Sequence, residues 1–157
     1  MRRRIRALLV LTLTLGLLVA AAPVLAAPTG VKLVVEEGFS DPLEGTIVSS
    51  SLPGCGSGTV ETVSSTSTPF GADGMRFRGT KVVQCGEGNT LKFRYVATYR
   101  SCDSPIDWGR WRITGGTGIY DGARGGGFLV GYYTGGSRTA CNSTGITDNW
   151  LGAIVLH

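Results

Sequence analysis

Histidine is nearly absent from this chain, and its scarcity excludes several kinds of active site. The single histidine, His157, is the last residue, and no Gly-x-Ser-x-Gly turn occurs, so a Ser-His-Asp triad is excluded. The four cysteines include no Cys-x-x-Cys pair, which argues against a zinc site. We therefore expect neither a metal ion nor a cofactor.

Helical patterns are also missing after residue 26. Glycines and prolines interrupt nearly every window, and the apolar residues alternate instead of recurring at three and four, which predicts an all-β sandwich or barrel. The expected strands are Val31–Glu37, Gly45–Ser50, Gly58–Ser65, Met75–Gln84, Thr90–Arg100, Gly109–Thr114, Phe128–Thr134 and Asn149–Leu156.

The segment Thr90–Arg100 has the clearest strand pattern. Successive side chains of a strand point to opposite faces, so Phe93, Tyr95 and Tyr99 share a face, and Arg94 lies on the other. One apolar and one polar face exclude a parallel α/β sheet, whose strands are apolar on both faces. The aromatic face forms either core packing or the wall of a cavity.

The N-terminal segment, residues 1–26, has the pattern of a secretory signal peptide. Arginines precede an apolar run from Ala7 to Ala22, and small residues follow at the expected cleavage site. A membrane anchor is the alternative, but the run is short for one. After cleavage we expect no membrane span, and residues 27–157 form a single domain.

Removing this segment makes the remaining chain nearly neutral. Four of the 15 basic residues lie in it, whereas all 11 acidic residues lie beyond it. Binding of nucleic acid or of an anionic membrane through a basic face therefore loses its main support, and no nucleic-acid partner is expected. We expect the protein to be extracellular or periplasmic.

Four cysteines in an exported chain predict two disulfides. Residues equidistant from a hairpin turn face each other, so the midpoint of each pair indicates the connectivity. Cys55 and Cys85 are centred on a turn-like segment at Phe70, and Cys102 and Cys141 on the glycine-rich turn near Tyr120. The other pairings centre within strands. We therefore predict Cys55–Cys85 and Cys102–Cys141.

The glycine-rich run that begins at Gly115 is not a phosphate-binding loop, because it lacks the Lys-Ser/Thr ending and a following helix. With the upstream Trp111, it resembles the Gly-Gly-Thr-Gly-x-Phe/Tyr-x-Gly-Ala-Arg-Gly signature of dirigent proteins and allene oxide cyclases. The Cys-x-Ser-Gly-Thr at Cys55–Thr59 is similar to bacterial secreted members of that superfamily. The motif residues are Gly115, Gly116, Thr117, Gly118, Tyr120, Gly122, Arg124 and Gly125.

The resemblance implies an eight-stranded antiparallel β-barrel with an interior cavity for a small hydrophobic or aromatic molecule. Plant members hold an unstable intermediate in one conformation, which needs positioning and exclusion of water more than a nucleophile. Plant members assemble into dimers or trimers, so the resemblance makes a homo-oligomer an alternative to a monomer here. Within the motif, Tyr120 is expected to point inward and Arg124 to pair with a carboxylate or with backbone carbonyls.

Three functions follow from these features. The leading one is ligand binding in the barrel, dirigent-like or cyclase-like. The second is an interaction or inhibitor module that acts through the loops Gly54–Gly58, Asp103–Trp108 and Gly135–Thr147, and that a filled interior would favour. The third is a hydrolase using carboxylates among Glu36, Glu37, Glu44, Asp103 and Asp107. The predicted cavity wall consists of Phe93, Tyr95, Tyr99, Trp111 and Tyr133, with Arg76 and Arg78 orienting the ligand.

Overall fold

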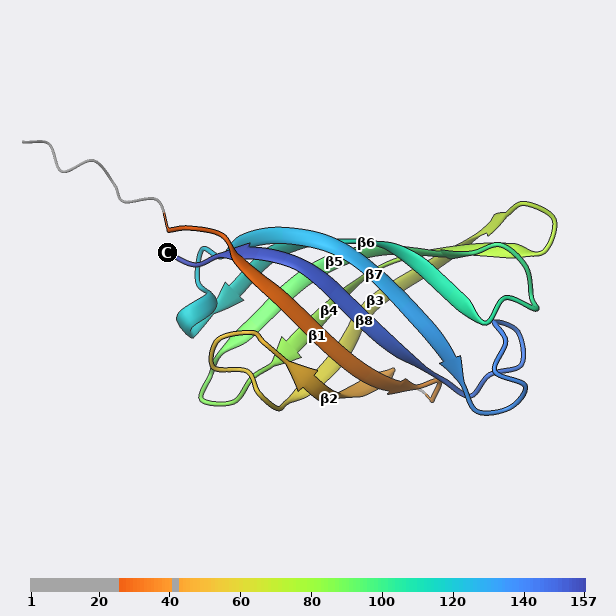
Figure 1. Ribbon diagram of the computed structural model, residues 1–157, viewed down its shortest axis with the longest axis horizontal. Coiled ribbons are helices and arrows are strands. Elements are labelled where there is room, and N and C mark those ends of the chain that lie inside the picture. The colour runs from red at the N-terminus through yellow and green to blue at the C-terminus, as the bar shows by residue number, and fades with distance from the viewer. Residues whose placement is uncertain (1–25, 41–42) are drawn as a thin grey trace, which may run out of the picture.

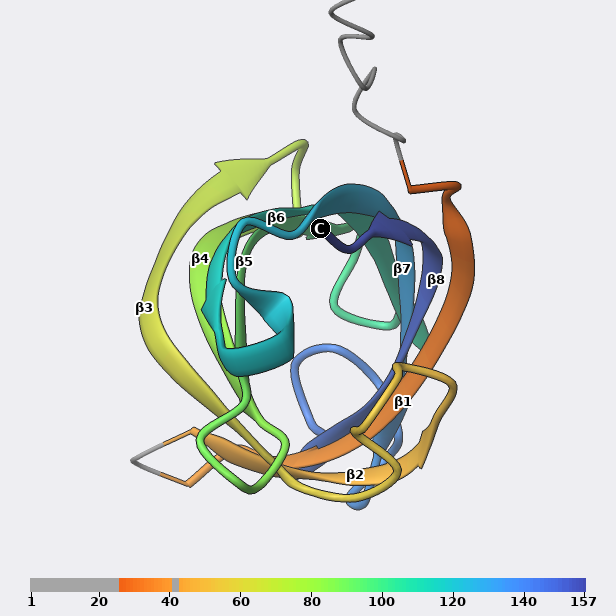
Figure 2. The same cartoon turned by 90° about the vertical axis from the view of Figure 1, so that its left-hand side faces the viewer.

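A computed structural model describes residues 26–40 and 43–157 of the chain, which form an eight-stranded antiparallel β-barrel. Each strand pairs with the next, and β8 pairs with β1 to close the ring (Figures 1 and 2). All eight predicted strands are present at their expected places. Their bounds are β1 Thr29–Gly38, β2 Glu44–Ser50, β3 Thr59–Phe70, β4 Gly74–Gln84, β5 Thr90–Tyr99, β6 Ile106–Thr117, β7 Arg124–Thr134 and β8 Gly145–Val155.

The strands are longer than the sequence predicted where glycine continues them. Gly115 to Thr117 belong to β6, although glycine is poor in strands, because the ladder to β5 extends to the Thr90–Thr117 pair. β7 likewise begins at Arg124 and passes through three glycines before Phe128. The turn between β6 and β7 is therefore short, and a 3-10 turn, η1 (Gly118–Tyr120), occupies its first half.

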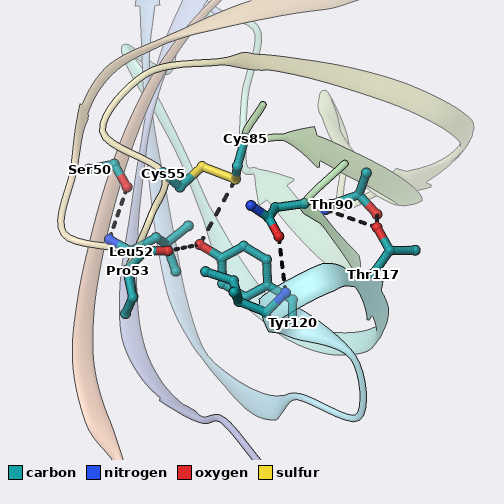
Figure 3. The surroundings of a disulfide bond; sticks show 10 residues. Ser50, Leu52, Pro53, Cys55, Cys85, Thr90, Thr117 and Tyr120 are labelled. Carbon is teal, nitrogen blue, oxygen red and sulfur yellow. Dashed lines mark hydrogen bonds between the residues drawn. A yellow bond between two sulfur atoms is a disulfide. The ribbon is translucent and has the colours of Figure 1, made fainter. Parts of the chain in front are cut away.

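One end of the barrel is closed by side chains around the first disulfide. The Cys55–Cys85 bond joins the β2–β3 loop to the end of β4, as predicted, and the Tyr120 hydroxyl beside it donates to the carbonyl of Pro53 (Figure 3). Tyr120 is fully buried and points inward, as expected. By contrast, the Arg124 side chain is exposed and forms no ion pair or hydrogen bond with another described residue, so its expected pairing is not observed.

The second predicted disulfide, Cys102–Cys141, is also present and lies at the opposite end of the barrel. It joins the β5–β6 loop to the β7–β8 loop, and these loops flank the β6–β7 hairpin on which the prediction was centred. Two disulfides fit an oxidising compartment such as the cell exterior. Within the described part of the chain, no helix is long and apolar enough to cross a membrane.

The core fills only part of the interior. Phe93 and Trp150 pack with ring centroids 4.5 Å apart, and Trp111 lies about 6 Å from both. The Trp111 indole donates to the carbonyl of Phe128 at 3.0 Å. Together with the Tyr120 end, these rings make a solid floor across the barrel. The predicted signal peptide, apart from its last residue, lies outside the described residues.

Candidate functional site

A pocket of about 300 Å³ lies between this aromatic floor and the loops at the Cys102–Cys141 end. Its size is at the lower end of the range typical of small-molecule sites. Apolar side chains make up much of its wall, and a group of charged and tyrosine side chains makes up the rest. The apolar members are Phe39, Leu43, Phe77, Ala97, Leu129, Ala140 and Ile146, and the polar members are Glu37, Thr62, Ser65, Lys81, Tyr95, Tyr99, Asp107, Tyr133 and Asp148.

Lys81 and Glu37 form a buried ion pair in this wall. Both oxygens of the Glu37 carboxylate accept from the Lys81 ammonium, and about 5% of each side chain is exposed. The ammonium also faces the rings of Tyr95 and Trp150 at 5.4 and 5.9 Å from their centroids. Burial disfavours the charged ammonium, but the charges of Glu37 and Asp148 outweigh this effect and raise the pKa of Lys81.

Asp148 also lies near this ammonium, and its Oδ2 is 3.8 Å from Lys81 Nζ. Burial, together with the negative charges of Glu37 and Asp107, raises the pKa of Asp148 to about 8. The positive charge of Lys81 offsets only part of this rise. At neutral pH Asp148 is therefore mostly a neutral carboxylic acid. Such a group can donate a hydrogen bond or a proton to a ligand in the pocket.

Asp107 provides a second buried carboxyl of different acidity. Burial raises the pKa of Asp107 to about 6, opposed by a 3.1 Å hydrogen bond from the backbone N–H of Gly131 and by the charge of Lys81. At neutral pH it is mostly ionised and can accept a proton. Two carboxyls with separated pKa values in one pocket are a typical acid–base arrangement.

The tyrosines Tyr95, Tyr99 and Tyr133 add hydroxyl groups to the polar part of the lining. The Tyr95 hydroxyl donates to Ser65 Oγ at 3.3 Å, and burial raises the pKa of Tyr95. Burial and the neighbouring Asp107 charge raise the pKa of Tyr133, so both hydroxyls stay protonated at neutral pH. The Tyr99 and Tyr133 rings meet edge to face with centroids 6.2 Å apart. These hydroxyls can donate to a ligand.

Strand alternation, and the space left by a glycine, explain how the charged and tyrosine side chains of six strands come to lie in one pocket. Glu37 occupies the next inward position of β1 after Val35, and Lys81 shares the inward face of β4 with Val83. Gly131 of β7 lies between the two aspartates in the ladder. A Cβ at Gly131 would come within 2.6 Å of both Asp107 Oδ1 and Asp148 Oδ1, so only glycine leaves room for the pair.

The structure separates the predicted cavity residues into three groups. Tyr95, Tyr99 and Tyr133 line the pocket. Phe93 and Trp111 are buried in the aromatic floor and do not line it. The assignment of Arg76 and Arg78 to the cavity wall is wrong, because both occupy outward positions of β4, in alternation with the inward Phe77 and Lys81.

Sequence reasoning missed Lys81 and Asp148, and it considered Glu37 and Asp107 only as two of five available carboxylates. Glu36, Glu44 and Asp103 are exposed, whereas Glu37 and Asp107 line the pocket. A usable signal was present in the alternation, because a charged residue at an inward position of a strand needs a buried partner. Among the described residues, no group of these acids is arranged to hold a metal ion.

The fold and the site define a disulfide-linked β-barrel with an internal, acid-lined pocket of ligand size. No family model, curated protein or solved structure matches the chain. Its function must therefore be argued from the geometry of the pocket.

Proposed function

We propose that the barrel is an exported protein that binds one small, largely apolar molecule carrying a carbonyl or hydroxyl group. The observation that carries this proposal is the pocket, where apolar walls surround a neutral acid, an ionised acid and tyrosine hydroxyls. Pockets with a few polar groups in an apolar lining are typical of small-molecule sites. The buried Thr62 hydroxyl lines the pocket without a hydrogen-bond partner among the described residues, and a ligand can supply one.

The chemistry that this pocket supports is proton transfer and conformational control. Both oxygens of Glu37 bind Lys81, so the amine is a charged, occupied group and not a free nucleophile. Asp148 is placed to protonate or hydrogen-bond a ligand oxygen, and Asp107 to accept a proton. An acid- or base-assisted cyclisation of a bound ligand needs only these groups and a wall that holds the ligand in one conformation. This is the class of function that the likeness to dirigent proteins and allene oxide cyclases implies, and we propose membership of that superfamily.

The pocket favours ligand binding over the interaction module, which a filled interior would have supported. Two of the three loops assigned to that module, Asp103–Trp108 and Gly135–Thr147, lie at the Cys102–Cys141 end of the barrel, next to the pocket. Asp107, which the sequence assigned to the first loop and which belongs to β6, lines the pocket itself. These loops therefore border the proposed ligand site.

Native mass spectrometry of the oxidised, signal-cleaved protein from its own secretion medium tests ligand binding. We expect an adduct of small-molecule mass, or one formed after incubation with a panel of phenols and medium-chain fatty acids. Ala97→Leu adds bulk inside the pocket and should weaken binding at least about tenfold, because the close-packed wall cannot move outward to restore the lost volume. Val96→Leu on the outer face of the same strand is the matched control. A bare mass under all conditions would contradict the proposal.

The pH dependence of binding tests the role of Asp148. Because the pKa of Asp148 is raised to about 8, the acid is neutral below that pH and ionises above it. The affinity for an uncharged phenol should therefore fall as the pH rises from 7 to 9. In Asp148→Asn, whose amide donates at every pH, this fall should disappear. An equal fall in both proteins would show that Asp148 does not contact the ligand.

A further inference from the structure

The nearly neutral total charge conceals an uneven distribution over the barrel surface. The outward positions of β4, β5 and β6 carry six basic residues and no acidic residue. The outward positions of β1, β2 and β3 carry three glutamates, Glu36, Glu44 and Glu61, and a single lysine, Lys32. The basic residues are Arg76, Arg78, Lys92, Arg94, Arg110 and Arg112.

Four of these arginines line an open groove of about 710 Å³ that crosses the strands. The ladders place Arg78, Val96 and Arg110 in one row, and Thr80, Arg94 and Arg112 in a second row two residues along the strands. Between the rows runs the backbone of Gly79, Tyr95 and Trp111, and the side chains of Tyr95 and Trp111 point inward. Ser64 and Thr66 of β3 add hydroxyls at one end of the groove.

No carboxylate in the described part of the chain forms an ion pair with any of these four arginines. Arg94 and Arg112 are directly opposite each other in the ladder, and like charges at such positions destabilise a sheet. A bound anion would relieve this repulsion and accept hydrogen bonds from both planar guanidinium groups. The arrangement therefore costs stability in the free protein and favours a polyanionic partner.

The lining of the groove favours one class of polyanion. The floor of the groove is backbone, since the Tyr95 and Trp111 rings lie on the inner face, so no aromatic face is available there for stacked nucleic-acid bases. Beyond this floor, Phe128 continues the first row with a 61% exposed ring. The Arg110 guanidinium lies over one face of the ring, 5.3 Å from its centroid, which leaves a single face on which the apolar side of a sugar can pack.

We propose that the arginine groove binds a linear acidic polysaccharide through its sulfate or carboxylate groups. Arg78 and Arg110 of the first row lie two strands apart, roughly 10 Å, so regularly spaced acid groups of one polymer can engage both of these arginines at once. The two disulfides fit the oxidising exterior where such polymers occur. This inference concerns the outer surface and is independent of the function proposed for the internal pocket.

Titration calorimetry with heparin and with polygalacturonate, in the oxidised protein at low salt, tests the groove. We expect binding to at least one polymer, weakening as salt increases, and the tighter polymer identifies the preferred acid group. The double variant Arg94→Gln/Arg112→Gln should lose at least about tenfold in affinity. The control Lys32→Gln/Arg138→Gln removes the same charge elsewhere and should lose less than twofold.

Three results would overturn the proposal. The first is absence of binding to both polymers at low salt. The second is an equal loss in the two double variants, which would indicate attraction by overall charge alone. The third is tighter binding of a single-stranded oligonucleotide or of phosphatidylglycerol vesicles than of either polymer. Thermal unfolding of both variants distinguishes lost binding from lost fold, and removing the Arg94–Arg112 repulsion should not lower the melting temperature.

Discussion

At the scale of single residues, Lys81 is the group on which the charged part of the pocket depends. Its ammonium lies within 4 Å of carboxyl oxygens of both Glu37 and Asp148, and over the rings of Tyr95 and Trp150. A buried carboxylate deprived of its partner is far more costly than a buried pair, because desolvation is then uncompensated. The stability of the barrel should therefore respond differently to removing one partner and to removing both.

We expect Lys81→Met to lower the free energy of unfolding by about 3–5 kcal/mol, because Glu37 is left buried without a partner. The double variant Glu37→Gln/Lys81→Met should be less destabilised than the sum of its two single variants. Urea denaturation of the four proteins gives the coupling energy. A loss below about 1 kcal/mol for Lys81→Met, as for an exposed ion pair, would contradict this account.

At the scale of elements, the glycine motif at the end of β6 contains two adjacent glycines with different constraints. A Cβ at Gly116 would approach the Tyr120 carbonyl oxygen to 2.5 Å and the Tyr120 Cβ to 2.7 Å, whereas a Cβ at Gly115 meets nothing within 4 Å. The close approach at Gly116 lets η1 fold back and bring Tyr120 into the closed end. Packing therefore requires glycine at position 116 but not at position 115.

Gly116→Ala should lower the free energy of unfolding by about 1–3 kcal/mol, because backbone atoms must move to admit the methyl group. Gly115→Ala, its neighbour, should change it by less than about 0.5 kcal/mol, since the space is open. Thermal or urea unfolding of both variants measures the difference. Equal effects would mean that the contact with Tyr120 does not govern this position.

The strand elements were predictable because their alternation is local, and the disulfides because each pair is centred on a hairpin. The lengths of β6 and β7 were less predictable. Glycines such as Gly115 and Gly126 weaken any strand signal, and only the ladders to neighbouring strands extend pairing through them. Local pattern thus identified the elements, and tertiary pairing decided where they end.

At the scale of the whole molecule, the two buried aspartates make stability depend on pH. Their folded-state pKa values are raised to about 6 for Asp107 and about 8 for Asp148, above the usual value near 3.9 in an unfolded chain. Their stabilising contribution is therefore complete below about pH 4 and is lost as the pH rises through 6 and then 8. Lys81, with its raised pKa, remains charged throughout this range.

The free energy of unfolding should accordingly fall by more than about 1 kcal/mol between pH 5 and pH 9. In Asp148→Asn the fall between about pH 6 and about pH 8 should be absent, and the fall below about pH 6 should remain, because Asp107 is unchanged. Urea denaturation at a series of pH values measures both profiles. A free energy that is constant or rises over this range would contradict the burial of neutral acids.

The sequence by itself determined the all-β class, the eight strands and the two disulfides, because alternation and turn signals act over short distances. The inward position of Tyr120 was expected from the resemblance of the glycine motif. The sequence also placed Tyr95 and Tyr99 on one face with Phe93. Only the tertiary structure decided which of these residues border the pocket and which fill the floor. It alone brought Glu37, Lys81, Asp107 and Asp148 together from four strands and gathered the arginines on one outer face. The physical reason is that closing the barrel places residues side by side that are far apart along the chain, and no local pattern in the sequence indicates such pairs.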